Sequence, residues 1–209
     1  QQILERFAKG ETQVLIGTQM VAKGLDFPNV TTVGVLAADM ILNLPDYSAS
    51  ERTFQLLTQV AGRAGRGDQP GKVIIQSYNP EHYSLLSAQQ HDYAQFYQKE
   101  LQMRNLMEYP PFTFMVRILV SDYTDDGLLD QLVQMSDAIA KAFPEIEFLG
   151  PAQAPIGMIR KRYRYHVILK GKNLAIVRQA AEYGQKVMNL SRKSNTLRIL
   201  IDVEPSNVL

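Results

Sequence analysis

Two consecutive prolines, Pro110 and Pro111, constrain the fold of this chain more strongly than any other feature. Proline has no backbone N–H, and its ring clashes with the preceding turn of a helix, so the pair fits neither a helix interior nor a central strand. The stretch "YPPF" at 109–112 therefore separates two parts of the chain. We predict a domain boundary there.

Before this boundary, apolar runs alternate with helical patterns. Ser48 and Glu51 have the spacing of a capping box, which predicts that a helix begins directly after Ser48. Strands that alternate with helices predict a parallel, doubly wound α/β arrangement. The expected elements are strand 13–17, strand 31–39, helix 49–66, strand 72–77 and a helical stretch that Asn79 and Pro80 cap and that reaches about 106.

After the boundary, the pattern predicts a smaller α+β domain. Its order, βαββαβ, is that of the ferredoxin-like split βαβ arrangement. We therefore divide the chain into residues 1–80 (α/β), residues 81–111 (a helical connector ending at "YPPF") and residues 112–209 (α+β). The expected elements of the last part are strand 114–122, helix 125–143, strand 146–150, strand 162–170, helix 173–189 capped by Asn173, and strand 197–203.

Composition excludes several classes of protein. The 209 residues are 45% hydrophobic and 21% charged, as in globular proteins. No apolar run reaches the roughly 20 residues of a membrane helix, and the first residues lack the apolar core of a signal peptide. With no cysteine and three scattered histidines, we expect no metal site. We expect a cytoplasmic protein, and a piece of a longer one, because the chain starts without methionine inside a helical pattern.

Basic residues concentrate near the carboxyl end. Residues 160–198 contain 11 lysines and arginines and one acidic residue, Glu182. Such a segment either binds an anionic partner or forms a solvated face.

Within this segment, "RKRYRYH" at 160–166 is expected to form a strand. The period of two then places one ladder of basic side chains on one face and the tyrosines on the other. We predict that the ladder tracks a DNA backbone, the alternative being that the tyrosines pack under the sheet and the arginines are solvated. The ladder consists of Arg160, Arg162, Arg164 and His166, opposite Lys161, Tyr163 and Tyr165.

The predicted helix 49–66 ends in "QVAGRAGRG" and has two stripes. Helical spacing gives Leu56, Leu57, Val60 and Ala64 a buried stripe and gives Gln59, Arg63 and Arg66 a polar one. Gly62 and Gly65 indicate either a close neighbour or a helix end, because glycine costs about 1 kcal/mol in a helix. Glycines beside guanidinium groups suit a polyphosphate, and a solvated arginine face is the alternative.

The segment "GTQMVAKGLDFPNV" at 17–30 is expected to lie at the carboxyl end of strand 13–17. Ligands of open α/β sheets bind at that edge. The alternative is a simple turn made by Gly24 and Pro28 and capped by Asp26. The chain contains no Walker A motif, so it has no phosphate-cradling loop of that kind.

Together these segments resemble conserved motifs of superfamily 2 helicases. The loop "GTQMVAKG" and the helix "TQVAGRAGRG" follow the order of the fifth and sixth motifs, and "YPPF" is shared with the primosomal replication-restart helicases, the PriA family. The resemblance covers essentially the whole chain. It implies an ATP-dependent DNA helicase that acts at stalled or branched forks in primosome assembly, with ATP and Mg²⁺ held between two RecA-like lobes.

The resemblance also implies which residues contact nucleotide and DNA. By position in the motifs, they are Arg66 as the arginine finger, Arg63 as a neighbouring phosphate contact, Gln59 and Gly62 beside the nucleotide, Gly24 and Asp26 in the nucleotide-facing turn, and Thr18 and Gln19 on the DNA backbone.

The family's first lobe and its cysteine-rich zinc-binding insertion have no counterpart in this sequence. We therefore expect a carboxyl-terminal fragment, made of part of the second RecA-like lobe and a last domain, that is inactive alone. The implied partners are single-stranded and forked DNA and replication-restart proteins, with single-stranded-DNA-binding protein as a candidate. The alternative is a non-catalytic module that binds nucleic acid or a replication partner.

Overall fold

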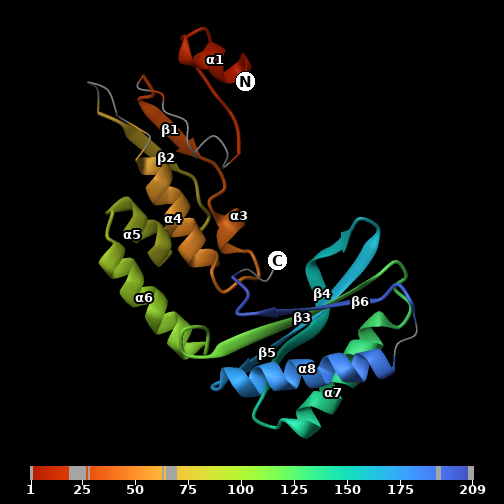
Figure 1. Ribbon diagram of the computed structural model, residues 1–209. Coiled ribbons are helices and arrows are strands. Elements are labelled where there is room, and N and C mark those ends of the chain that lie inside the picture. The colour runs from red at the N-terminus through yellow and green to blue at the C-terminus, as the bar shows by residue number, and fades with distance from the viewer. Residues whose placement is uncertain are drawn as a thin grey trace. The chain divides into compact units, whose positions relative to one another are not determined.

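The structure is a computed structural model that describes residues 2–18, 27, 29–62, 64, 70–191 and 194–206. The chain divides into two compact units (Figure 1). Unit 1 consists of Gln1–Leu44 and Ala49–Glu100, and unit 2 consists of Pro45–Ser48 and Leu101–Leu209. The last boundary between the two units therefore follows Glu100 and lies inside the helix Tyr93–Leu106.

Unit 1 contains a parallel pair of strands and several helices. Strand β1 pairs with β2 in register, from Thr32 opposite Lys72 to Val35 opposite Ile75. Helices α4, α5 and α6 supply the buried core, in which the rings of Phe54 and Phe96 stack at 4.3 Å. The elements in and leading out of unit 1 are α1 (Gln2–Ala8), β1 (Thr32–Val35), α3 (Asp39–Leu42), α4 (Ala49–Ala61), β2 (Lys72–Ile75), α5 (Tyr83–Gln89) and α6 (Tyr93–Leu106).

Two of the expected elements before the boundary are wrong. Residues 13–17 do not form a strand, and Val14 and Ile16 are 74% and 87% exposed. An apolar run becomes a strand only where a neighbouring strand accepts its hydrogen bonds, and β1 pairs only with β2 among the described residues. The helical stretch 79–106 is two helices, because the chain leaves the helical conformation between Gln89 and Tyr93, where His91 has a φ of 52°. The first of them begins after His82, whose ring accepts a hydrogen bond from the Ser84 amide.

Unit 2 is a four-stranded antiparallel sheet with two helices. The strands follow the spatial order β4-β5-β3-β6, and the chain order is βαββαβ. The expected helices are confirmed within a few residues, and the Asn173 side chain caps α8 by accepting from the Ala175 amide at 2.9 Å. The elements are β3 (Phe114–Asp122), α7 (Leu128–Ala142), β4 (Glu147–Ile159), β5 (Arg162–Gly171), α8 (Leu174–Leu190) and β6 (Arg198–Val203).

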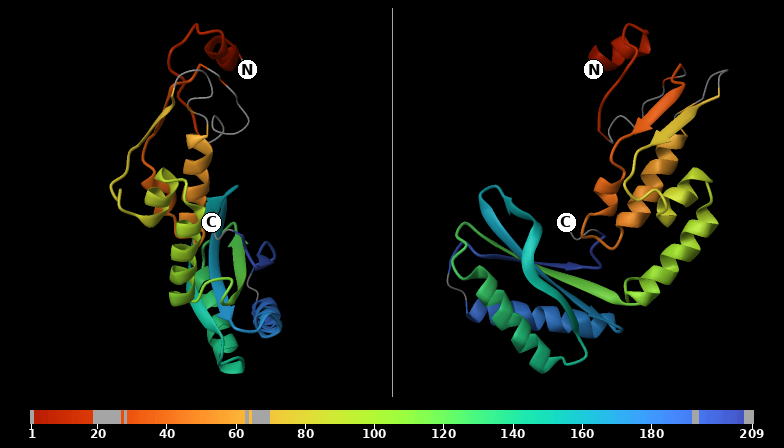
Figure 2. Two further views of the ribbon diagram at one scale, coloured as in Figure 1. Left: turned by 90° about the vertical axis from the view of Figure 1, so that its left-hand side faces the viewer. Right: turned by 180° about the vertical axis from the view of Figure 1, so that it is seen from behind.

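The two faces of this sheet differ in chemistry. Helices α7 and α8 lie on one face, as both views of Figure 2 show, and bury Val116, Ile118 and Val120 of β3. Residues of the opposite parity point to the other face, which we call the open face of unit 2. It carries Arg117 and Ser121 of β3 together with their register partners on β5 and β6. Polar side chains can therefore gather there without entering the core.

The short segment Pro45–Ser48 joins α3 to α4 and packs in unit 2. The Tyr47 ring stacks on Tyr109 at 5.7 Å, and its hydroxyl donates to the Pro205 carbonyl at 3.1 Å. Both tyrosines cover a small buried cluster of Met115 and Ile168. One aromatic side chain from far upstream thus completes the packing of this unit.

Candidate nucleic-acid and nucleotide sites

Helix α4 buries part of the apolar stripe that its sequence predicts, and of the predicted polar stripe the structure describes only Gln59. Leu57 and Val60 are buried, and Gln59 is exposed. The helix ends at Ala61, five residues before the expected end, and Gly62 follows it directly. A Cβ atom at Gly62 would meet only ordinary contacts with the carbonyls of Gln59 and Thr58, at 3.6 and 3.7 Å. Among the described residues, the helix end accounts for Gly62 and no close neighbour does.

Several residues named by the resemblance lie outside the described residues. Among the described ones, Thr18 is exposed and follows the segment that was expected to be a strand. Gln59 and Gly62 lie one turn apart at the end of α4. The site residues outside the described part of the chain are Gln19, Gly24, Asp26, Arg63 and Arg66.

Asp39 is a buried residue that the sequence analysis did not single out. Its carboxylate accepts hydrogen bonds from the Ser77 hydroxyl at 2.7 Å and from the amides of Tyr78 and Asn79 at 2.8 and 3.3 Å. These bonds, that from Ser77 above all, lower the pKa of Asp39. The carboxylate ties the segment after β2 to the start of α3, at the carboxyl edge of the parallel pair. An acid as the last residue of the predicted strand 31–39 was the available signal.

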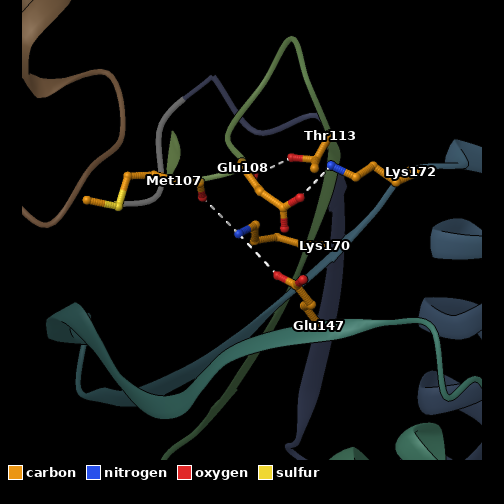
Figure 3. Close-up of polar contacts among 6 residues, drawn as sticks. All are labelled: Met107, Glu108, Thr113, Glu147, Lys170 and Lys172. Carbon is orange, nitrogen blue, oxygen red and sulfur yellow. Dashed lines mark hydrogen bonds and ion pairs between the residues drawn. The ribbon is translucent and has the colours of Figure 1, made fainter. Parts of the chain in front are cut away.

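The "YPPF" segment is anchored to the sheet by two lysines of unit 2 (Figure 3). The Lys170 ammonium is buried, donates to the Met107 carbonyl at 3.2 Å and pairs with Glu147 at 3.4 Å. It also lies 5.2 Å from the centre of the Tyr109 ring. Lys172 donates to Glu108 at 2.6 Å. Electrostatic contacts therefore fix the chain where it enters β3.

The Glu108 carboxylate gives a measurable consequence of this anchor. Its pKa is lowered, first by the hydrogen bond from Lys172 and then by the charge of that lysine. A lowered carboxyl pKa stabilises the fold above the pKa of the unfolded chain, and the stabilisation is lost as the pH falls through the folded-state value. We expect Lys172→Ala to move the Glu108 pKa upward toward its ordinary value in a carboxyl-carbon NMR titration.

The matched control is Lys186→Ala, which removes an exposed lysine from α8. This variant should leave the Glu108 titration where it is in the parent chain. A Glu108 pKa that does not move in Lys172→Ala would mean that the ion pair does not form in solution.

The expected strand 160–166 is only partly correct. Strand β5 begins at Arg162, while Arg160 and Lys161 form the two-residue turn of the β4–β5 hairpin. Both turn residues have positive φ, 50° and 63°, which matches the twist of the flanking strands. Sequence period alone does not mark this turn, because neither residue is glycine or asparagine. Arg160 is therefore displaced from the ladder into an exposed turn.

Arg162 is 8% exposed and is held by the backbone of unit 2. Its guanidinium donates to the Ser121 carbonyl at 3.0 Å and to the Thr196 carbonyl. It also lies over the Tyr123 ring, 4.4 Å from the ring centre. These contacts join β5 to β3 and to the segment before β6. Arg162 thus has a structural position, which the expected ladder did not foresee.

The remaining residues of the segment divide as the alternating pattern predicts. Tyr163 and Tyr165 pack against the core under α7 and α8, so they are not available for stacking on bases. Arg164 lies on the open face and donates to the Ile156 carbonyl at 3.0 Å. Burial, followed by the charges of Arg117 and Arg164, lowers the pKa of His166, which is therefore neutral at pH 7.

Neither a metal-ligand cluster nor a membrane-spanning helix occurs in the described part of the chain. No group of three or more His, Cys, Asp or Glu side chains there could hold a metal ion. The chain has no cysteine, so its residues do not fit a thiolate zinc site. No helix among the described residues is long and apolar enough to cross a membrane.

Two family models match separate parts of the chain. Residues 1–68 match the model described as "Helicase conserved C-terminal domain". Residues 105–206 match the model described as "Primosomal protein N C-terminal domain". The first match includes both helicase motifs, and the second includes "YPPF" and all six elements of the antiparallel part of unit 2.

Relatives named "Replication restart protein PriA" are similar to this chain over most of its length. The protein from Bacillus subtilis is 45% identical over 173 residues, which are 82% of this chain and 22% of the relative. The Synechocystis protein is 42% identical over 80% of this chain and 20% of its own length. The Treponema pallidum protein is 36% identical over 100% of this chain and 32% of its own length. The chain thus spans about a fifth to a third of these relatives, and it belongs to the PriA family of replication restart proteins.

Proposed function

We propose that this chain is the carboxyl-terminal part of an ATP-dependent DNA helicase that acts at stalled or branched forks in replication restart. One observation carries the proposal. The motifs "GTQMVAKG" and "QVAGRAGRG" lie in order within the residues that match the helicase model, and the primosomal domain match follows them. Taken alone, the first motif could be a simple turn and the second a solvated arginine face. The helicase match and the primosomal match occur together in one chain, which favours the helicase.

In this proposal unit 1 supplies part of the second RecA-like lobe. The parallel pair β1–β2, with α4 beside it, supports that assignment. The order β4-β5-β3-β6 and the chain order βαββαβ support a ferredoxin-like domain for residues 112–209. Residues 1–80 would then be lobe and 81–111 a helical connector. We also propose that the whole protein acts in the cytoplasm. A chain without cysteine needs no oxidising compartment, because it forms no disulfides.

The proposed nucleotide contacts come from the motif "QVAGRAGRG" at 59–67 and from the segment 17–30. Arg66 places a guanidinium at the phosphoryl group in transfer, Arg63 contacts a neighbouring phosphate, and Gln59 and Gly62 lie beside the nucleotide. ATP with Mg²⁺ supplies the phosphoryl group, and the Mg²⁺ ligands lie in other parts of the longer protein, because this chain has no Walker A motif. In the same proposal, Gly24 and Asp26 face the nucleotide. Thr18 and Gln19 contact the DNA backbone.

A second candidate is a non-catalytic module that binds nucleic acid or a replication partner such as single-stranded-DNA-binding protein. The basic composition of residues 160–198, with Glu182 as the single acid, favours it. The two candidates differ in one measurable respect. Only the first requires that this chain contributes to ATP hydrolysis in the longer protein.

Fork unwinding tests the proposal. The longer protein that contains this chain should separate the strands of a labelled fork when ATP and Mg²⁺ are present, and a linear duplex of the same sequence should stay paired. The 209-residue chain alone should hydrolyse no ATP above background, with or without DNA. Unwinding that needs no ATP, or turnover by the isolated chain after a contaminant check, would contradict the proposal.

A further inference from the structure

We propose that a hollow at the turn end of the β4–β5 hairpin is a phosphate pocket that holds one phosphodiester of single-stranded DNA. The inference rests on the proposed nucleic-acid role of the domain and assigns the place, the contacts and the ligand group. Arg160, Arg164 and Arg198 are the contact residues, and Arg162 is a positioning residue.

The hollow is shallow and open to solvent, with a volume of about 320 Å³. Four of the six lining residues are arginines and one is a serine, so the polar side chains of the lining offer mainly hydrogen-bond donors. Two of the arginines, Arg160 and Arg198, are exposed and lie within reach of a ligand from solution. The lining residues are Ser121, Ile159, Arg160, Arg162, Arg164 and Arg198.

The sheet register explains why three of these residues meet. Ser121 of β3 is the register partner of Arg164 on β5 and of Arg198 on β6. The three side chains therefore form one row across neighbouring strands, on the open face. A small residue between two long ones leaves a depression with a guanidinium on each side. Arg198 enters the site from β6, and the sequence analysis missed it.

The charges in this row lack acidic partners. Among the described residues, no carboxylate oxygen lies within 4.0 Å of a guanidinium nitrogen of Arg160, Arg164 or Arg198. Like charges that line one hollow raise the free energy of the folded protein unless an anion neutralises them. The lowered pKa of His166, which has Arg117 and Arg164 among its causes, is a sign of the same positive potential. An anion is therefore the ligand that the pocket favours.

Arg162 keeps the floor of the pocket in place. It donates to the Ser121 carbonyl, and its Nε atom lies 3.4 Å from the Ser121 hydroxyl oxygen and donates to it. The hydroxyl thus accepts one hydrogen bond from below, and its own hydrogen can donate to a phosphate oxygen. Arg164 is held in part by the Ile156 carbonyl. Two of the four guanidiniums are therefore preorganised, which lowers the entropy lost when a ligand binds.

The surroundings favour a nucleotide chain over a free phosphate. Ile156, Met158 and Ile159 of the same hairpin are 48%, 49% and 42% exposed. Apolar side chains beside a row of arginines suit a base attached to its phosphate, since the base buries apolar surface while the phosphate takes the charged hydrogen bonds. We therefore assign the pocket to single-stranded DNA.

The test is a salt titration of the 209-residue chain with a labelled oligothymidylate, followed by fluorescence anisotropy. Each phosphate contact on single-stranded DNA contributes about 0.7 to the slope of log K against log salt. The double variant Arg160→Ala with Arg198→Ala removes both exposed contacts to the one phosphodiester and should flatten the slope by about 0.7, and Arg198→Ala alone should flatten it by a measurable part of that amount. Arg198→Lys should keep the slope. An oligonucleotide with an uncharged methylphosphonate backbone should not bind.

Lys186→Ala is the charge-matched control, because it removes an exposed cation from α8 on the other side of the sheet. The slope of log K against log salt for Lys186→Ala should equal that for Lys141→Ala on α7. Both slopes should be steeper than the slope for Arg198→Ala. Unfolding midpoints check that each variant is folded.

Three results would overturn the inference. An unchanged slope in Arg198→Ala, with the parent chain still binding, would place DNA elsewhere and leave the proposed function intact. An acidic peptide or inorganic phosphate could displace the oligonucleotide from the parent chain at matched ionic strength but not from Arg198→Ala. That result would assign the pocket to the competing ligand. A parent chain that binds no DNA would remove both the pocket's ligand and the nucleic-acid role, while fork unwinding would still test the helicase assignment.

Discussion

Replacing Arg66 by alanine in the longer protein is expected to lower DNA-stimulated ATP turnover at least about a hundredfold while DNA affinity stays nearly unchanged. An arginine finger stabilises charge that develops only in the transition state, so its loss acts on turnover and not on ground-state binding. Steady-state hydrolysis with saturating DNA, and a separate DNA titration, measure the two quantities.

Two further variants make this result specific to Arg66. Arg66→Lys keeps one positive charge but loses the planar donor pair, so it should restore little of the turnover. Arg52→Ala removes another arginine, which lies in α4, and this variant should retain most of the ATP turnover. Normal DNA-stimulated hydrolysis by Arg66→Ala would leave Arg66 as a solvated surface residue and would favour the non-catalytic module.

Arg162→Ala is expected to destabilise unit 2 by about 3 kcal/mol, because the carbonyls of Ser121 and Thr196 each lose a hydrogen bond from a charged donor. The Tyr123 ring also loses its cation. Hydrogen exchange of the β3 and β5 amides reports the free energy of opening in this unit. The protection factors of those amides should fall roughly a hundredfold.

Arg160→Ala is the matched control, since it removes an exposed arginine only two residues away. Its stability should stay within about 0.5 kcal/mol of the parent chain. If Arg162→Ala kept its amide protection but lost DNA affinity, Arg162 would be a DNA contact and the structural assignment would be wrong.

The sequence predicted unit 2 better than unit 1, and the reason lies in local signals. Helix α8 has a capping asparagine, Asn173, and a regular apolar stripe, while α7 ends before Pro144, so breakers and period agreed. Strand 13–17 had an apolar run and nothing more. Pairing depends on a partner that is distant in sequence, and no local pattern encodes it.

The candidate sites divide in a similar way. The helicase motifs could be found from the sequence because each is a continuous run of residues, as is the basic segment 160–166. The structural position of Arg162 could not, because its acceptors, Ser121 and Thr196, lie on other strands and turns. Arg198 belongs to the hollow only through the register of β6 on β3. Such constellations appear once the sheet is assembled.

The placement of Pro45–Ser48 has a consequence for modularity. The covalent chain crosses between the units three times, after Leu44, Ser48 and Glu100, so unit 2 is not a contiguous gene segment. A polypeptide cut out at residue 105, where the family match begins, would lack Tyr47 and would leave the Tyr109 ring and the cluster beneath it partly uncovered. Transplanting this domain between relatives would therefore need the four-residue segment as well, supplied as a tethered graft or a separate peptide.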